Sequence, residues 1–411
     1  MSTITPDSTT PDSTLTPDQE PIFTLTTGPV DAYPAVLRGL SRPVLYDYDP
    51  AFLGFYERVV EKVRSAFKTQ HMPVILHGEP VLGLEAGAAS LIARGDVVLN
   101  LVSGVYGAGF GFWAKRYCAE LLEIRVPFDE VIDPGRVAAL LEARPDIRIV
   151  AVCHHDTPSG TINPVAEIGR IVAAHGAYLL VDAVSSFGGM DVGPDTCQAD
   201  LFVTGPNKCL GCPPGLTLLG VTPRAWRKMK DNPDAPRDSI LSILDWEQAW
   251  RKDRPFPFTP SVAEINGLDA ALDLYLAEGP ERVWARHALT AEACRAGVLA
   301  MGLRLWPADV RTASPTTTAV RVPGSVEDAA LRAAARARYG AVFSSGRGET
   351  LGKLVRIGHM GPTARPMYAV VAVTALGGAL RALGHPLEVA AGVAAALAVI
   401  DDGVGDASSG G

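Results

Sequence analysis

A lysine and an aspartate in this chain follow two neighbouring apolar runs, where polar side chains can do chemistry. Asp182 ends the run 178–181, and Lys208 lies in a Gly/Pro loop after the run 201–204. Taken singly, Asp182 can be a turn or helix cap and Lys208 a surface lysine. As a pair they fit a site for a pyridine ring. The carboxylate keeps the ring nitrogen protonated, and a lysine with a lowered pKa attacks the ring's aldehyde carbon.

Two further apolar runs lead into segments that can complete such a site. Residues 97–102 precede a Gly-rich segment, 103–110, in which Tyr106 either stacks on a flat ring or packs in the core at a helix start. Residues 147–152 precede the segment 153–160, where we favour Thr157 as a hydroxyl donor to a ring substituent. The adjacent His154 and His155 point to opposite faces of an extended chain, so we assign them structural roles.

The elements that position these residues alternate between short β-rich runs and Ala-rich stretches of helical length, such as 134–143 and 165–175. This alternation predicts an α/β fold around a mostly parallel sheet, in which ligands bind beyond the carboxyl ends of the strands. We expect a large ring-binding domain over residues 21–270 and a smaller α+β domain over 271–400. The Pro, Asp, Ser and Thr-rich residues 1–20 predict a disordered tail, and residues 401–411 a frayed end.

Composition excludes several function classes. A formal charge of −8 and a pI near 5.5 provide no basic patch for nucleic acid. Six cysteines are too few for a disulfide framework, and the pair Cys209 and Cys212 makes a poor metal site, so we expect no metal. The N-terminus lacks the pattern of a secretory signal, and the longest apolar stretches are too short to span a bilayer. These features favour a cytoplasmic protein without a membrane partner.

The motifs resemble those of the class V aminotransferase group of fold-type-I pyridoxal-phosphate enzymes, over roughly residues 22–400. The matching segments are 27–29, 154–160, 181–183, 204–208, 213–215 and 356–358. The resemblance implies a large domain with a mostly parallel seven-stranded sheet and a smaller C-terminal α+β domain. It makes Lys208 the Schiff-base lysine, Asp182 the partner of the ring nitrogen and Arg356 the clamp on the substrate carboxylate. It also implies a homo-oligomer, a tetramer built as a dimer of dimers.

Three departures from the group affect the residues that would hold a cofactor phosphate. Glu79 and Pro80 stand where the group has a Ser/Gly-rich stretch, so a negative charge and a missing N–H meet the phosphate. Pro206 replaces a common serine two residues before the lysine. Phenyl rings, including Phe258, replace the tyrosine that a neighbouring subunit usually supplies. The departures therefore predict a site for unphosphorylated pyridoxal or pyridoxamine, with no tightly bound cofactor.

In this interpretation Glu79 accepts a hydrogen bond from the hydroxymethyl group of pyridoxamine, and Arg347 is a second cation for the substrate carboxylate. The alternatives are a helix N-terminal carboxylate for Glu79 and a solvated loop arginine for Arg347. Cys209 and Phe258 either line the pocket or only pack in the core.

The resemblance and its departures together predict an enzyme of vitamin B6 degradation that converts pyridoxamine and pyruvate to pyridoxal and L-alanine. Lys208 would take a proton from the C4′ carbon of pyridoxamine and return it to the α-carbon that becomes that of L-alanine. The first alternative is an ordinary alanine, serine, glyoxylate or pyruvate transaminase that uses bound pyridoxal phosphate. The second is a protein that captures pyridoxal without turnover, and the presence of Asp182 and Arg356 argues against it.

Overall fold

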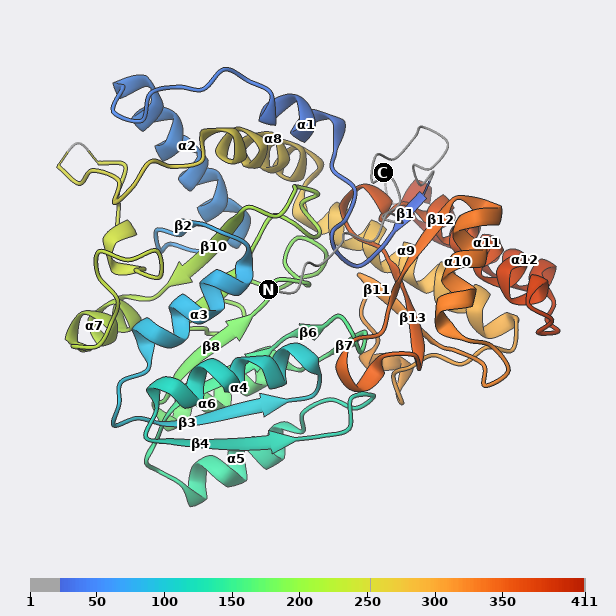
Figure 1. The fold of residues 1–411 in the computed structure, drawn as a ribbon, viewed down its shortest axis with the longest axis horizontal. Coiled ribbons are helices and arrows are strands. Elements are labelled where there is room, and N and C mark those ends of the chain that lie inside the picture. Colours follow the sequence, from blue (N-terminus) through green and yellow to red (C-terminus); the bar gives the residue numbers. More distant parts are fainter. Residues whose placement is uncertain (1–22, 252, 410–411) are drawn as a thin grey trace, which may run out of the picture.

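The computed structural model describes residues 23–251 and 253–409, so the tail expected at 1–20 lies outside the described residues. Two sheets with helices packed around them make up the molecule (Figure 1). The larger sheet has seven strands in the order β2-β10-β9-β8-β5-β3-β4. β10 is antiparallel to both of its neighbours and the other pairings are parallel, which confirms the mostly parallel sheet. The strands are β2 (Val74–His77), β3 (Val97–Val102), β4 (Glu120–Arg125), β5 (Ile147–Cys153), β8 (Tyr178–Asp182), β9 (Leu201–Thr204) and β10 (Leu216–Val221).

The helices of this half cover both faces of the sheet. From β2 to β4 the chain moves toward one edge, through α3 (Pro80–Leu91) and α4 (Val105–Tyr117), and from β4 it turns back through α5 (Pro134–Ala143) and α6 (Val165–His175). Because crossovers are right-handed, this reversal places α3 and α4 on one face and α5 and α6 on the other, and the members of each pair contact one another. The remaining helices of this half are α1 (Pro34–Leu40), α2 (Pro50–Phe67), α7 (Pro223–Asp231) and α8 (Val262–Glu278).

The smaller sheet has four strands in the order β1-β12-β13-β11. They are β1 (Phe23–Leu25), β11 (Thr317–Arg321), β12 (Ala341–Ser345) and β13 (Leu354–Gly358), and they pack with α9 (Pro280–Ala300), α10 (Asp328–Tyr339), α11 (Pro366–Ala382) and α12 (Val389–Ser409). The short pair β6 (His155–Asp156) and β7 (Thr161–Ile162) lies between the two halves (Figure 1). The four-stranded sheet and its helices form the α+β unit that the sequence predicts.

The limits of the two halves differ from the expected ranges at three places. β1 belongs by residue number to the large domain expected at 21–270, yet it pairs in parallel with β12 of the small sheet. The expected boundary at residue 270 lies inside α8, and the break comes at Gly279, which has φ +89° and precedes Pro280. The end expected to be frayed at 401–411 is helical as far as Ser409.

Candidate active site

The polar residues singled out in the sequence gather at the carboxyl ends of the large sheet's strands. Asp182 ends β8, whose neighbours are β5 and β9, and Lys208 follows β9. A cavity of about 270 Å³ lies at this edge. Its lining consists of Glu79, Pro80, Val81, Leu84, Tyr106, His155, Asp182, Val184, Ser185, Lys208 and Arg347. Five predicted site residues, Glu79, Tyr106, Asp182, Lys208 and Arg347, therefore share one cavity.

Lys208 presents a largely buried amine to this cavity. Its Nζ donates to the Thr27 carbonyl oxygen at 2.5 Å, and a Cβ on Gly28 would lie only 2.0 Å from the same Nζ. Gly28 has φ +135°, a conformation that favours glycine, so both space and backbone geometry require glycine beside the amine. Burial, with a smaller effect from the positive charge of Arg356, lowers the pKa of Lys208 to about 8. A usable fraction of the amine is therefore neutral near neutral pH.

Asp182 is the carboxylate that the sequence predicts as the partner of the ring nitrogen. It is 8% exposed, and burial raises its pKa to about 6, while its Oδ1 accepts the Val184 N–H at 3.0 Å. The charges of Glu79 and Lys208 act on it in opposite directions, which places all three groups near one another. A buried carboxylate can hold a protonated ring nitrogen, because these opposite charges attract each other strongly where water is excluded.

Asp156 is a site residue that the sequence analysis missed. It is completely buried, and its Oδ2 accepts the N–H groups of Tyr106 at 2.7 Å and Gly107 at 3.1 Å. A Cβ on Gly104 would lie 2.1 Å from Asp156 Cγ, so Gly104 makes room for the contact. Asp156 thereby fixes the first turn of α4, from which Tyr106 reaches the cavity. The only signal in the sequence was its place after an apolar run.

The small sheet supplies two arginines, of which Arg347 lines the cavity and Arg356 acts on Lys208 through its charge. Arg347 follows β12, and its Nη1 lies 3.4 Å from the Tyr106 hydroxyl, with its guanidinium carbon 5.6 Å from the centre of that ring. Arg356 lies on β13 and donates its Nε to the Ser345 carbonyl oxygen at 2.7 Å. Burial lowers the pKa of Arg356, and its charge in turn lowers the Lys208 pKa. The arrangement provides two cations beside the amine, as binding of a small carboxylate requires.

The first turn of α3 has used its N–H groups within the chain. Glu79 caps the helix, because its Oε2 accepts the Val81 N–H at 2.9 Å, and its carbonyl oxygen accepts the Leu82 N–H at 2.8 Å. Pro80 has no N–H, and the Gly78 N–H is donated to Gly215. The Pro80 ring also packs against Gly205, where a Cβ would lie 2.3 Å from its Cγ. The helix start that could bind a phosphate is therefore occupied by a carboxylate and a proline ring.

Four predicted residues do not line this cavity: Arg356, described above, and Thr157, Cys209 and Phe258. Thr157 is completely buried, with no hydrogen-bond partner for its hydroxyl among the described residues. Cys209 faces a separate cavity together with Tyr33 and Arg286, because the turn after Lys208 directs it away, and burial raises its pKa to about 12. Phe258 packs 5.0 Å from Trp246 and 6.2 Å from His77, measured between ring centres.

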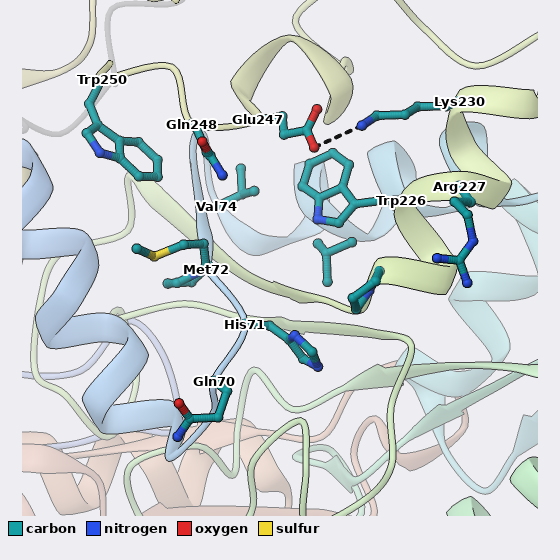
Figure 2. A pocket seen from close by; sticks show the side chains of 13 residues that line it. Gln70, His71, Met72, Val74, Trp226, Arg227, Lys230, Glu247, Gln248 and Trp250 are labelled. Carbon is teal, nitrogen blue, oxygen red and sulfur yellow. Dashed lines mark hydrogen bonds and ion pairs between the residues drawn. The ribbon is translucent and has the colours of Figure 1, made fainter. Parts of the chain in front are cut away.

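Another cavity in the described part of the chain lies away from the predicted site residues. This cavity of about 380 Å³ is lined by residues just before β2 and just after β10, and there Trp226 lies beside an ion pair of Lys230 and Glu247, with Trp250 farther away beyond Gln248 (Figure 2). None of the predicted site residues lines it. Within the described ranges, no three His, Cys, Asp or Glu side chains gather as metal ligands, and none of the helices combines the length and hydropathy needed to cross a membrane.

The sequence and the fold are both similar to those of known aminotransferases. The family model described as aminotransferase class-V matches residues 111–359. Pyridoxamine–pyruvate transaminase of Mesorhizobium japonicum is 70% identical over 382 residues, which cover 93% of this chain and 97% of the relative. The structure of pyridoxamine-pyruvate aminotransferase from Mesorhizobium loti has a TM-score of 0.92 at 70% identity, with 93% of this chain and 98% of the other covered. The ureidoglycine-glyoxylate aminotransferase structure from Bacillus subtilis has a TM-score of 0.87 at 30% identity, with 92% and 97% covered.

Proposed function

Because the chain belongs to the class-V aminotransferase family, we propose that it transfers the amino group of pyridoxamine to pyruvate and so forms pyridoxal and L-alanine. The observation that carries the proposal is the first turn of α3, where Glu79 occupies the Val81 N–H and Pro80 contributes none. A dianionic phosphate would meet a carboxylate there instead of donors. The 70% identical relative, named for these two substrates, supports the same conclusion.

The residues present fit a pyridine ring without a phosphate. Asp182 suits the ring nitrogen, Tyr106 suits a ring face, and Glu79 has a second carboxylate oxygen available for a hydroxymethyl group. A ring bound in this way withdraws electrons from the carbon that gains or loses a proton. Pyridoxamine is then a substrate that enters and leaves, not a tightly held cofactor. We propose that the Thr157 hydroxyl, which is buried without a hydrogen-bond partner among the described residues, donates to a ring substituent, and that Cys209 and Phe258 are packing residues.

Lys208 is the group that moves the proton in this proposal. With its pKa lowered to about 8, the amine accepts a proton from one substrate carbon near neutral pH and returns it to another. The same amine is the residue that holds pyridoxal covalently. Arg356, together with Arg347, holds the pyruvate carboxylate from the small sheet, while Asp182 keeps the ring nitrogen protonated from the large one.

The test measures L-alanine formation by cofactor-stripped protein supplied with pyruvate and either pyridoxamine or pyridoxamine phosphate. We expect turnover with pyridoxamine and little with the phosphate ester, and Lys208→Ala supplies the background rate. If activity instead requires pyridoxal phosphate and an amino donor, the chain is an ordinary transaminase of this family. Capture of pyridoxal without alanine formation would make it a binding protein.

We also propose a cytoplasmic homotetramer built as a dimer of dimers. The six cysteines are free, which suits a reducing compartment. Large apolar side chains exposed on a short segment before α2 support a subunit interface, with Val44 77% and Tyr46 69% exposed. Light scattering coupled to size-exclusion chromatography distinguishes monomer, dimer and tetramer directly.

A further inference from the structure

His155 is a buried residue of the cavity for which the proposed reaction has so far no use. It is 1% exposed and lines the cavity with Lys208 and Asp182. Its Nε2 has no hydrogen-bond partner among the described residues, although the atom is buried. A buried polar atom without a partner is unfavourable, so a group that enters the cavity would satisfy it.

The surroundings of the other ring nitrogen determine which atom carries the proton. Nδ1 lies 3.1 Å from the Ser185 carbonyl oxygen, 3.0 Å from the Thr316 hydroxyl oxygen and 3.3 Å from the Ser314 hydroxyl oxygen. The Ser185 carbonyl can only accept, and the Thr316 hydroxyl donates to that carbonyl, so its oxygen also faces Nδ1 as an acceptor, while the Ser314 hydroxyl lies 3.0 Å from the Thr316 hydroxyl. Nδ1 therefore bears the hydrogen, and Nε2 of the neutral ring is a hydrogen-bond acceptor. Burial lowers the pKa of His155 to about 3, so the ring stays neutral at physiological pH.

The order of the strands indicates which group of the ligand His155 meets. Asp182 on β8 takes the ring nitrogen, and Glu79 follows β2, on the β9 side of β8. His155 follows β5, on the other side of β8. The hydroxymethyl and hydroxyl groups of pyridoxamine flank the carbon that Lys208 addresses, on opposite sides of the axis through the ring nitrogen. A ring that directs its hydroxymethyl group toward Glu79 directs its hydroxyl group toward β5.

We propose that His155 Nε2 accepts a hydrogen bond from the ring hydroxyl of pyridoxamine and so makes the site selective for hydroxylated pyridines. Thr157, from the same segment, remains the proposed donor to that hydroxyl's oxygen, so the group would be held both as donor and as acceptor. This inference rests on the proposed function, because it assumes that pyridoxamine is the ligand. It replaces the purely structural role first expected for His155.

The experiment measures binding of pyridoxamine and of 3-deoxypyridoxamine, which lacks the ring hydroxyl, by calorimetry without pyruvate. The ratio of the two dissociation constants is the hydroxyl preference, and it is obtained within one protein sample. We expect His155→Leu to reduce this preference about three- to twelvefold, the value of one hydrogen bond. His155→Gln, whose amide oxygen can accept, should keep most of it.

His154→Gln is the matched control, because His154 lies one residue away, bonds Ser186 and does not line the cavity. It should leave the preference unchanged. An unchanged preference in His155→Leu, or an equal loss in His155→Gln or His154→Gln, would overturn the role of His155. Wild-type protein that binds pyridoxamine in those cases leaves the proposed function standing, whereas no binding of pyridoxamine by the wild type would overturn both.

Discussion

Replacing Lys208 with methionine should stabilise the protein at neutral pH while it abolishes turnover. The folded-state pKa of about 8 lies some 2.5 units below the value of 10.5 for a solvated lysine. Keeping this amine charged in the folded protein therefore costs about 3 kcal/mol at pH 7. Methionine has a similar length and no charge, so it removes this cost. It also leaves the Thr27 carbonyl without its donor, a loss of about 1 kcal/mol.

The net gain is therefore about 2 kcal/mol at pH 7, and its pH dependence is the sharper test. A lysine with a lowered folded pKa binds fewer protons when folded, so wild-type stability rises as pH increases from about 8 to 10.5. The charge cost falls to about 1 kcal/mol at pH 10, which is close to the carbonyl loss. The variant's advantage should then disappear.

Urea unfolding of the substrate-free protein at pH 7 and pH 10 measures both values, provided that protein concentration is held constant. Lys115→Met is the matched control, because Lys115 is exposed on α4 and should change stability by less than about 0.5 kcal/mol at either pH. A Lys208→Met variant that is less stable than wild type at pH 7, or equally favoured at both pH values, would refute the inference of a desolvated amine.

Three further substitutions test other parts of the site. Arg356→Lys should raise the KM for pyruvate at least about tenfold, because an ammonium cannot bind a carboxylate through two parallel bonds, and steady-state kinetics should show a nearly unchanged KM for pyridoxamine; equal changes in both would contradict this role. Glu79→Gln keeps an oxygen for the Val81 N–H but removes the charge, so the rate ratio of pyridoxamine phosphate to pyridoxamine should rise, and an unchanged ratio would count against charge exclusion. Asp156→Ala removes the acceptor of two N–H groups and should lower the unfolding free energy by about 2 kcal/mol, whereas Asp156→Asn should lose less than half as much; equal losses in urea unfolding would contradict this assignment.

The sequence predicts the parts of this fold that have strong local patterns. Two strands and two helices have the expected limits: 97–102, 201–204, 134–143 and 165–175. In these segments the spacing of apolar residues and the Gly, Pro, Ser or Asp residues at the ends indicate the same boundaries. Three strands of the large sheet were not predicted: β10, which is apolar but enters the sheet antiparallel after an irregular loop, the four-residue strand β2, and the edge strand β4. The pairing of β1 with β12 joins segments more than 300 residues apart, and three residues contain no local sign of it.

The site shows the same division between local and long-range information. Asp182 and Lys208 could be found because Asp182 ends its strand and Lys208 lies in the loop after the next one. The role of Asp156 depends on its closeness to Gly104, and that of His155 on carbonyl and hydroxyl groups of Ser185 and Thr316, which only the folded chain brings together. Cys209 shows that closeness in sequence can also mislead, because it directly follows Lys208 but faces a different cavity.

The segment that follows β1 connects the small sheet to the surroundings of the Lys208 amine. Residues Phe23–Leu25 are held in the small sheet, and two residues later the Thr27 carbonyl accepts a hydrogen bond from Lys208 Nζ, which stabilises the charged amine. A rotation of the small sheet that withdrew this carbonyl would lower the proton affinity of Lys208 further. The same rotation would move Arg347, which follows β12 beside β1, and Arg356 on β13, the next strand of that sheet. If the arginines hold the substrate carboxylate as proposed, its binding and the basicity of the amine would be coupled through a single short strand.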